Sequence, residues 1–260
     1  MSDIRGRFVW YDLLTSDPKA AEAFYTNVIG WTTEPWGPPE AAYTMFSNEE
    51  GPVGGIGEVG KDAASVPGPP NWIAYIGTPD VDATVEQAKA LGAEVLVEPT
   101  DIPTVGRFAM LVDPQGAVFA PFASGSGHLE MNARTPGMFG WHELHTTDVD
   151  AGWAFYEALF GWLKTGEFDM GPDHGTYRMY GHTPGVPLGG MMNKPLDKPA
   201  PTWTYYIVVA DILATLDRVK ANGGQVTYGP QEVPGGDVVA TCVDPQGAAF
   251  ALTQLATPAA

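Results

Sequence analysis

Two acidic residues stand at matching places in a sequence that repeats itself. Asp12 lies in the run FVWYDLL and Glu143 in the run FGWHELH, each two residues after a tryptophan, Trp10 or Trp141. Because side chains alternate along a strand, each tryptophan shares a face with its carboxylate. A carboxylate on an enclosed face either acquires a raised pKa and serves as a general base, or accepts hydrogen bonds from Tyr and Trp and does nothing else. Asp12 and Glu143 are therefore the candidate catalytic residues, with the structural alternative kept open.

The histidines offer a second kind of chemistry, and all five follow residue 127. His142 and His145 point to opposite faces of a strand, so the two cannot hold one ion together. WHELH also lacks the spacing of the zinc-binding HExxH helix. A metal held by His145 and Glu143 with His174 or His182 is the alternative. The sequence predicts no metal and no other cofactor.

The chain repeats itself over most of its length at a shift of 131 residues. VDPQGAVFA begins at Val112 and VDPQGAAFA at Val243. Gly54 and Gly55 match Gly189 and Gly190 only after a gap, at a shift of 135. A repeat this long indicates duplicated domains. We place them at residues 1–131 and 132–260, joined by the Gly-rich and polar segment SGSGHLEMNARTP.

Each copy reads as two units of one strand, a helix and three strands. Asp17 followed by Pro18 predicts the start of the first helix, which Gly30 ends. Asp80 and Gly92 bound the second helix in the same way. Short apolar runs punctuated by Gly and Pro predict antiparallel strands, and DPQG predicts the turn between two of them. The fold class is α+β.

This order of motifs (strand, SD or TD, a helix with Phe-Tyr, Gly-Trp, and later VDPQGA) resembles the vicinal oxygen chelate (VOC) superfamily. That superfamily includes glyoxalase I, bleomycin resistance proteins and extradiol dioxygenases, and the tandem form is most similar to its Cfp30B-like branch. The resemblance implies two glyoxalase-like domains, each made of two βαβββ units that form curved mixed sheets around a cavity. It also implies a pseudo-dimeric monomer or a homodimer.

The family's enzymes hold a divalent metal at four positions. Those positions fall here at Trp10 and Trp141, at or beside Trp72 and Trp203, at Ala120 and Ala251, and in the gapped regions around Gly54 to Glu58 and Gly189 to Asn193. Tryptophan and alanine side chains offer no lone pair to a metal, and in the gapped regions only Glu58 could ligate, which alone is insufficient. The resemblance therefore implies a cavity that lacks the family's metal ligands.

A metal-free cavity with aromatic walls suits a small aromatic or amphipathic ligand. The expected ligand-binding residues are Trp10, Trp72, Arg107, Trp141, His145, Trp203 and Tyr205. Two structural interpretations stay open: the tryptophans fill the core, and Arg107 pairs with Asp101 or Asp12. The alternative functions are a VOC-type enzyme of lyase or dioxygenase type, metal-free or with a displaced metal near His145, and an interaction module whose clefts its own tryptophans fill.

Composition limits the partners. The net charge of −18, from 31 acidic and 13 basic residues, repels phosphate backbones and anionic membranes. No apolar stretch reaches the roughly 18 residues of a membrane span. The only cysteine, Cys242, lies in an apolar strand pattern and is expected to be an inert core thiol. We expect a cytoplasmic protein whose partner is a small molecule, with no nucleic acid and no membrane.

Overall fold

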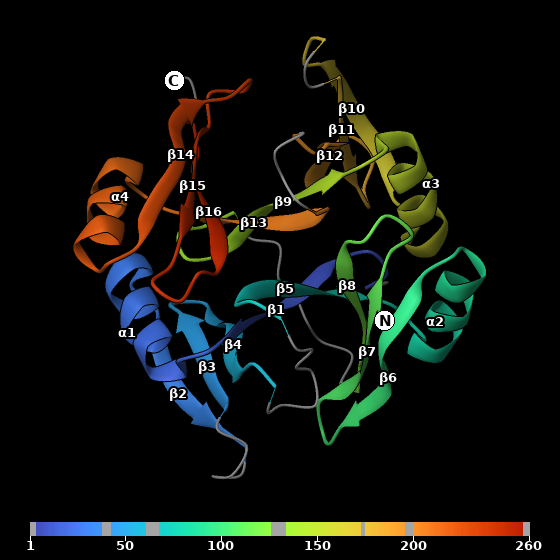
Figure 1. Ribbon diagram of the computed structural model, residues 1–260, viewed down its shortest axis with the longest axis horizontal. Coiled ribbons are helices and arrows are strands. Elements are labelled where there is room, and N and C mark those ends of the chain that lie inside the picture. Colours follow the sequence, from blue (N-terminus) through green and yellow to red (C-terminus); the bar gives the residue numbers. More distant parts are fainter. Residues whose placement is uncertain are drawn as a thin grey trace. The chain divides into compact units, whose positions relative to one another are not determined.

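The computed structural model describes residues 4–37, 43–60, 68–125, 134–172, 175–195 and 200–256. Figure 1 shows the helices and strands, coloured along the chain from blue at the N-terminus to red at the C-terminus. The first copy contains β1 (Phe8–Thr15), α1 (Pro18–Ile29), β2 (Thr32–Trp36), β3 (Tyr43–Asn48), β4 (Gly51–Glu58), β5 (Asn71–Gly77), α2 (Val81–Ala90), β6 (Glu94–Ile102), β7 (Gly106–Val112) and β8 (Val118–Ser124). The second contains β9 (Phe139–Thr146), α3 (Val149–Phe160), β10 (Leu163–Asp169), β11 (Thr176–Gly181), β12 (Gly189–Asn193), β13 (Thr202–Val208), α4 (Ile212–Ala221), β14 (Gln225–Glu232), β15 (Val238–Val243) and β16 (Ala249–Gln254).

The predicted helix boundaries are confirmed. The Asp17 side chain accepts the N–H of Ala20 at the start of α1, and Gly30 ends the helix with φ of 89°. Asp80 caps α2 in the same way, by accepting the N–H of Ala83. A residue with a Cβ rarely adopts the left-handed conformation of Gly30, so this glycine fixes where α1 stops.

The strands form two mixed sheets with the same order. The first sheet is β2-β3-β4-β1-β5-β8-β7-β6, and the second is β10-β11-β12-β9-β13-β16-β15-β14. In both sheets the first strand of a βαβββ unit pairs in parallel with the last, as β1 does with β4 and β9 with β12. The other neighbours within a unit are antiparallel, as β3 and β4 are. The predicted α+β class and the mixed sheets are thus confirmed.

The structure divides into two compact units, and each takes one half from each copy. Unit 1 contains Met1–Trp10, Ile73–Met131 and Trp141–Thr204, and unit 2 contains Tyr11–Trp72, Asn132–Gly140 and Tyr205–Ala260. Figure 1 shows α1 beside α4 within unit 2, and α2 beside α3 within unit 1. Side chains join these helix pairs: Arg218 Nε donates to the carbonyl of Val28, and Gln87 Nε2 to that of Ala158. The boundary placed at residue 131 stays a prediction and lies outside the described residues.

The repeated motifs bind each other across the copies, inside one unit. In unit 2 the Trp72 indole donates to Tyr25 Oη at 2.9 Å, and Tyr25 donates to Asp244 of the second DPQG turn at 3.2 Å. In unit 1 Trp203 donates to Tyr156, which donates to Asp113 of the first DPQG turn at 3.0 Å. Each buried polar group thereby finds a partner, as burial requires. The phenylalanine-tyrosine pair of one copy is matched to the turn of the other.

The two Gly-Trp tryptophans close the same kind of link. Trp31 Nε1 donates to the carbonyl of Gly137 at 2.8 Å, and Trp162 Nε1 donates to the carbonyl of Gly6 at 2.8 Å. Both indoles are almost fully buried, at 3% and 0% exposed. Each tryptophan is therefore a core residue that joins its own copy to the segment before the first strand of the other.

We expect Cys242 to resist thiol reagents while the protein is folded. Its side chain on β15 is 1% exposed, and burial raises the pKa of the thiol to about 12. Only the thiolate reacts, so the folded protein should show negligible reaction with a disulfide reagent at pH 8, and one thiol per chain should react in urea. Rapid stoichiometric reaction of the native protein would contradict the burial of this residue.

No helix among the described residues is long and apolar enough to cross a membrane.

Candidate functional site

Four side chains of β9 and β11 form a connected polar group in unit 1, which we call the Glu143 cluster (Trp141, Glu143, His145 and Tyr177). The Trp141 indole donates to Tyr177 Oη at 2.9 Å, and Tyr177 donates to Glu143 Oε2 at 2.8 Å. His145 Nε2 lies 2.9 Å from Glu143 Oε1, and both of these side chains are 12% exposed. The group is thus nearly enclosed, and each member is fixed by another.

The alternation of β9 explains why three members share a face. Trp141, Glu143 and His145 are partly exposed, whereas His142 and Leu144 between them are buried. His142 stacks on Phe8 with ring centroids 3.7 Å apart, and its Nδ1 lies 2.8 Å from the carbonyl of Leu188. Burial lowers the pKa of His142 to about 3, so its ring is neutral. The prediction that His142 and His145 point to opposite faces is confirmed.

A glycine lets the fourth member reach the cluster. Tyr177 stands on β11, and β12 separates β11 from β9. On β12, Gly190 is the residue directly opposite Glu143. A Cβ on Gly190 would lie 2.2 Å from Tyr177 Oη, closer than any real contact. The tyrosine ring therefore lies across β12 in the space that a glycine leaves, and its hydroxyl meets the carboxylate.

The first copy repeats this arrangement in unit 2. Tyr43 Oη donates to Asp12 Oδ1 at 2.6 Å, and Gly55 is directly opposite Asp12 in the parallel pair of β1 and β4. A Cβ on Gly55 would lie 2.0 Å from Tyr43 Oη. The histidine has no counterpart, because Leu14 stands where the second copy has His145. Only the second copy adds an imidazole, a side chain that both donates and accepts hydrogen bonds, to the carboxylate and the tyrosine.

The other predicted ligand residues lie elsewhere. Trp72 and Trp203 are buried, with their indole N–H groups bonded to Tyr25 and Tyr156. Tyr205 is 3% exposed and packs edge-on against the ring of Tyr11. These contacts agree with the interpretation that the aromatic residues fill the core. We therefore leave Trp72, Trp203 and Tyr205 out of the proposed ligand site.

Arg107 of β7 and Trp10 of β1 belong to the first copy and lie outside the Glu143 cluster. Arg107 binds Asp82 through Nε and Nη2 at 2.7 and 2.9 Å, and Asp101 through Nη1 at 2.8 Å. These ion pairs raise the pKa of the guanidinium further, and the predicted pairing with Asp101 is confirmed. Sequence reasoning missed Asp82, which lies in the first turn of α2. Trp10 is a half-buried residue of β1, on the strand that carries Asp12.

Within the described ranges, no group of three or more His, Cys, Asp or Glu side chains is placed to hold a metal ion. His174 lies outside those ranges, and the Nδ1 of His182 lies 3.0 Å from the hydroxyl of Thr183. Ala120 and Ala251, at the positions that the resemblance assigns to a metal-binding glutamate, are fully buried methyl groups. The side chains at these two positions do not fit a divalent metal.

The geometry of the Glu143 cluster suits hydrogen bonding and proton transfer. Both carboxylate oxygens of Glu143 have partners, so this residue orients its neighbours. When His145 Nε2 is protonated and donates to Glu143 Oε1, the lone pair of the neutral imidazole lies on Nδ1. A carboxylate that orients a histidine in this way also stabilises the imidazolium that forms when the ring accepts a proton.

Known proteins resemble the chain along nearly its whole length. The family model described as the Glyoxalase/Bleomycin resistance protein/Dioxygenase superfamily matches residues 7–120 and 138–252. A putative glyoxylase, CFP32 of Mycobacterium tuberculosis, is 31% identical over 94% of this chain and 92% of its own. The anthracycline biosynthesis protein DnrV of Streptomyces peucetius is 31% identical over 96% of this chain and 94% of its own.

Solved structures share the fold at low sequence identity. The Mn(II)-bound glyoxalase from Novosphingobium aromaticivorans superposes with a TM-score of 0.62 and 17% identity over 97% of this chain and 82% of its own. The 2,2',3-trihydroxybiphenyl 1,2-dioxygenase from Sphingomonas wittichii gives a TM-score of 0.66 and 12% identity over 96% of this chain and 90% of its own. With one match of the family model in each half, the chain belongs to the Glyoxalase/Bleomycin resistance protein/Dioxygenase superfamily, as its motifs predict.

Proposed function

We propose that the protein binds a small aromatic or amphipathic molecule at the Glu143 cluster, in a cavity that lacks the family's metal ligands. The observation that carries the proposal is the connected set of hydrogen bonds from Trp141 through Tyr177 to Glu143, with His145 on the other carboxylate oxygen. Polar groups already held in place lose little entropy when a ligand binds. The two aromatic rings supply the flat apolar surface that such a ligand needs.

We assign the ligand to the second copy. Both copies hold a carboxylate and a tyrosine hydroxyl in contact, so that pair alone does not distinguish them. His145, in place of Leu14, gives the second copy an added polar group 2.9 Å from its carboxylate. A site with donor and acceptor groups discriminates among ligands more sharply than an apolar one, because a wrong ligand leaves those groups without partners.

A second candidate function is acid–base catalysis of the lyase type at the same cluster, without a metal. The close contact between His145 Nε2 and Glu143 Oε1 favours it. In this reaction His145 takes a proton from a carbon of the bound substrate, and the electron pair of that C–H bond forms a double bond and expels the leaving group from the neighbouring carbon. Glu143 stabilises the resulting imidazolium, which returns its proton to the leaving group. Tyr177 holds the carboxylate from the other side and fixes the direction of its lone pairs. Glu143 then acts as the positioning residue and His145 as the base.

The matched carboxylates provide the test of binding. Because a relative acts in anthracycline biosynthesis, daunorubicin is a suitable aromatic, amphipathic probe, and its intrinsic fluorescence reports binding. We expect Glu143→Gln to weaken binding about tenfold, the equivalent of about 1.4 kcal/mol. Tyr177→Phe should weaken it about threefold. Gly190→Ala should do at least as much as Glu143→Gln, because its Cβ displaces the tyrosine ring.

Asp12→Asn, in the equivalent pair of the first copy, is the matched control and should leave the dissociation constant unchanged. All titrations are run in 0.3 M salt, since a chain of net charge −18 attracts a cationic probe without specificity. Equal losses in Asp12→Asn and Glu143→Gln, or no loss in either, would show that the ligand does not bind at the Glu143 cluster.

A further inference from the structure

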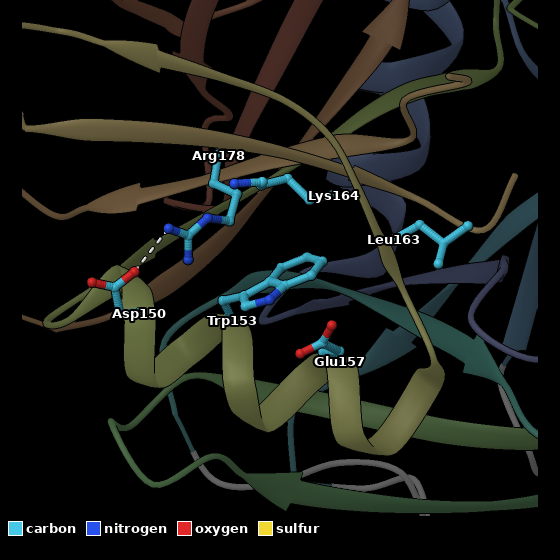
Figure 2. A pocket seen from close by; sticks show the side chains of 6 residues that line it. All are labelled: Asp150, Trp153, Glu157, Leu163, Lys164 and Arg178. Atoms are coloured by element: carbon cyan, nitrogen blue, oxygen red, sulfur yellow. Dashed lines mark hydrogen bonds and ion pairs between the residues drawn. The ribbon is translucent and has the colours of Figure 1, made fainter. Parts of the chain in front are cut away.

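A separate depression lies on the other side of β11. It has a volume of about 500 Å³ and is lined by Asp150, Trp153 and Glu157 of α3, by Leu163 and Lys164 of β10, and by Arg178 of β11. Arg178 follows Tyr177 directly, and consecutive side chains of a strand point to opposite faces. The depression, which we call the Trp153 pocket, is therefore distinct from the Glu143 cluster on the same strand. Figure 2 shows the six residues that line it.

Arg178 is fixed at one wall of the pocket. Its Nη2 donates to Asp150 at 2.8 Å, its Nε donates to Glu167 at 2.9 Å, and its side chain is only 12% exposed. The guanidinium carbon lies 5.8 Å from the centre of the Trp153 ring. Figure 2 shows the guanidinium above the indole and turned toward Asp150. A guanidinium has five donor hydrogens, and these two ion pairs use only part of them, so a fixed donor remains for a ligand acceptor.

The rest of the pocket divides by charge. Lys164 stands on the same side as Arg178, with its side chain 53% exposed and its Nζ 3.5 Å from Glu167. Glu157 lies one helical turn after Trp153 on α3 and is exposed, so the helix side of the pocket is acidic. Between the two sides lies the flat surface of the Trp153 indole. The pocket thus offers cations, an aromatic plane and a carboxylate in that order.

The fold does not require these residues. At the corresponding positions the first copy has Lys19, Glu22 and Thr26 on α1, Thr32 and Thr33 on β2, and Thr44 on β3. Thr33 donates to Glu22 there at 2.6 Å, and neither the aromatic ring nor the arginine is present. All six lining residues differ between copies that share their strand order and their helix caps. A surface that varies while its scaffold is kept indicates a property of the second copy alone.

We propose that the Trp153 pocket binds a planar aromatic zwitterion of amino-acid size. The ring stacks on Trp153, the carboxylate pairs with Arg178 and Lys164, and the ammonium group pairs with Glu157. A ligand that carries only a negative charge makes no ion pair with Glu157. A ligand that carries only a positive charge makes none with Arg178 or Lys164. Each unused charge costs affinity, since both must still be desolvated.

Three probes of similar shape test this charge pattern. L-phenylalanine carries both charges, 3-phenylpropionate carries only the carboxylate, and phenethylamine carries only the ammonium group. Calorimetric titration should show L-phenylalanine binding with a dissociation constant of about 1 mM and the other two at least about fivefold more weakly. Trp153→Ala should abolish binding. Lys164→Gln should weaken L-phenylalanine and 3-phenylpropionate about threefold, and Glu157→Gln should weaken L-phenylalanine and phenethylamine by the same factor.

Lys89→Gln is the matched control, because Lys89 is an equally exposed lysine paired with a glutamate three residues away, on α2. It should leave all three titrations unchanged. The Trp153 pocket is not such a site if no probe binds up to about 20 mM, if Glu143→Gln abolishes binding, or if 3-phenylpropionate binds as tightly as L-phenylalanine. Lys164→Gln and Glu157→Gln change exposed side chains, so loss of folding does not confuse the result.

Discussion

Replacing Asp113 with alanine is expected to lower the free energy of unfolding by about 3 to 5 kcal/mol. The carboxylate is 4% exposed. Its Oδ1 accepts the N–H groups of Gln115, Gly116 and Ala117 at 2.8 to 2.9 Å, and its Oδ2 accepts the hydroxyl of Tyr156 at 3.0 Å. Alanine would leave the buried N–H of Ala117 and the buried hydroxyl of Tyr156 without this acceptor, and would remove the bonds to Gln115 and Gly116 at the edge of the turn. Urea unfolding followed by circular dichroism measures the loss.

Tyr156→Phe separates the two halves of that effect. It removes the bond that comes from the second copy, and with it the acceptor of the Trp203 indole, and leaves the three bonds inside the turn, so about 2 kcal/mol is expected. Asp17→Ala, which removes an exposed helix cap, should cost about 1 kcal/mol. If Asp113→Ala costs no more than Tyr156→Phe, the carboxylate does not hold the turn together. Asp244 accepts equivalent bonds from Gln246, Ala248 and Tyr25, so Asp244→Ala should behave like Asp113→Ala.

These two aspartates show where sequence reasoning stops. The shift of 131 residues identifies Asp113 with Asp244 and Tyr25 with Tyr156, and turn chemistry predicts what each aspartate does inside its own DPQG. A period identifies equivalent residues, but it does not say which copy supplies a contact. Tyr25 meets Asp244 and not Asp113 because each compact unit takes one βαβββ unit from each copy. That pairing depends on how helices pack, and nothing local to either motif encodes it.

The candidate site divides in the same way. The alternation of β9 was enough to put Trp141, Glu143 and His145 on one face, and the structure connects all three. Tyr177 was missed because it lies two strands away, in the region where the repeat needs gaps. The sequence did contain a signal for it, the repeated glycine pairs Gly54-Gly55 and Gly189-Gly190 that follow the gap. Gly190 and its counterpart Gly55 are glycines because a tyrosine ring occupies the place of a side chain.

Arg107 and the buried tryptophans show a different limit. The sequence suggested Asp101 or Asp12 as the partner of Arg107. In the structure two of its hydrogen bonds go to Asp82, a residue of α2, which packs on the sheet by tertiary contacts. For Trp72 the strand pattern does not decide between a ligand cavity and a core. In the structure Trp72 is buried and its indole donates to Tyr25 of α1, a contact that comes from tertiary packing.

Acidification is expected to destabilise the protein through His142. Burial lowers the pKa of this ring to about 3 in the folded protein, whereas an exposed histidine titrates near 6.5. Between these values the unfolded chain binds a proton that the folded protein excludes, so stability falls as the pH falls from about 6.5 toward 3. At pH 4 the loss from this one group is about 3 kcal/mol. At about pH 8 and above, His142 is neutral in both states and contributes no pH dependence.

His142→Phe isolates this effect from the titration of the many carboxylates. Phenylalanine keeps a flat ring against Phe8 but cannot bond to the carbonyl of Leu188, so the variant should be less stable than the wild type at pH 7 by about 1 kcal/mol. As the pH falls to 4, the order should reverse, because only the wild type pays to keep a neutral ring. His182→Gln, at a part-exposed histidine, should follow the wild type at every pH. A constant difference between His142→Phe and the wild type from pH 7 to pH 4 would mean that the ring is protonated where it lies, and that the stack of His142 on Phe8 does not exclude water.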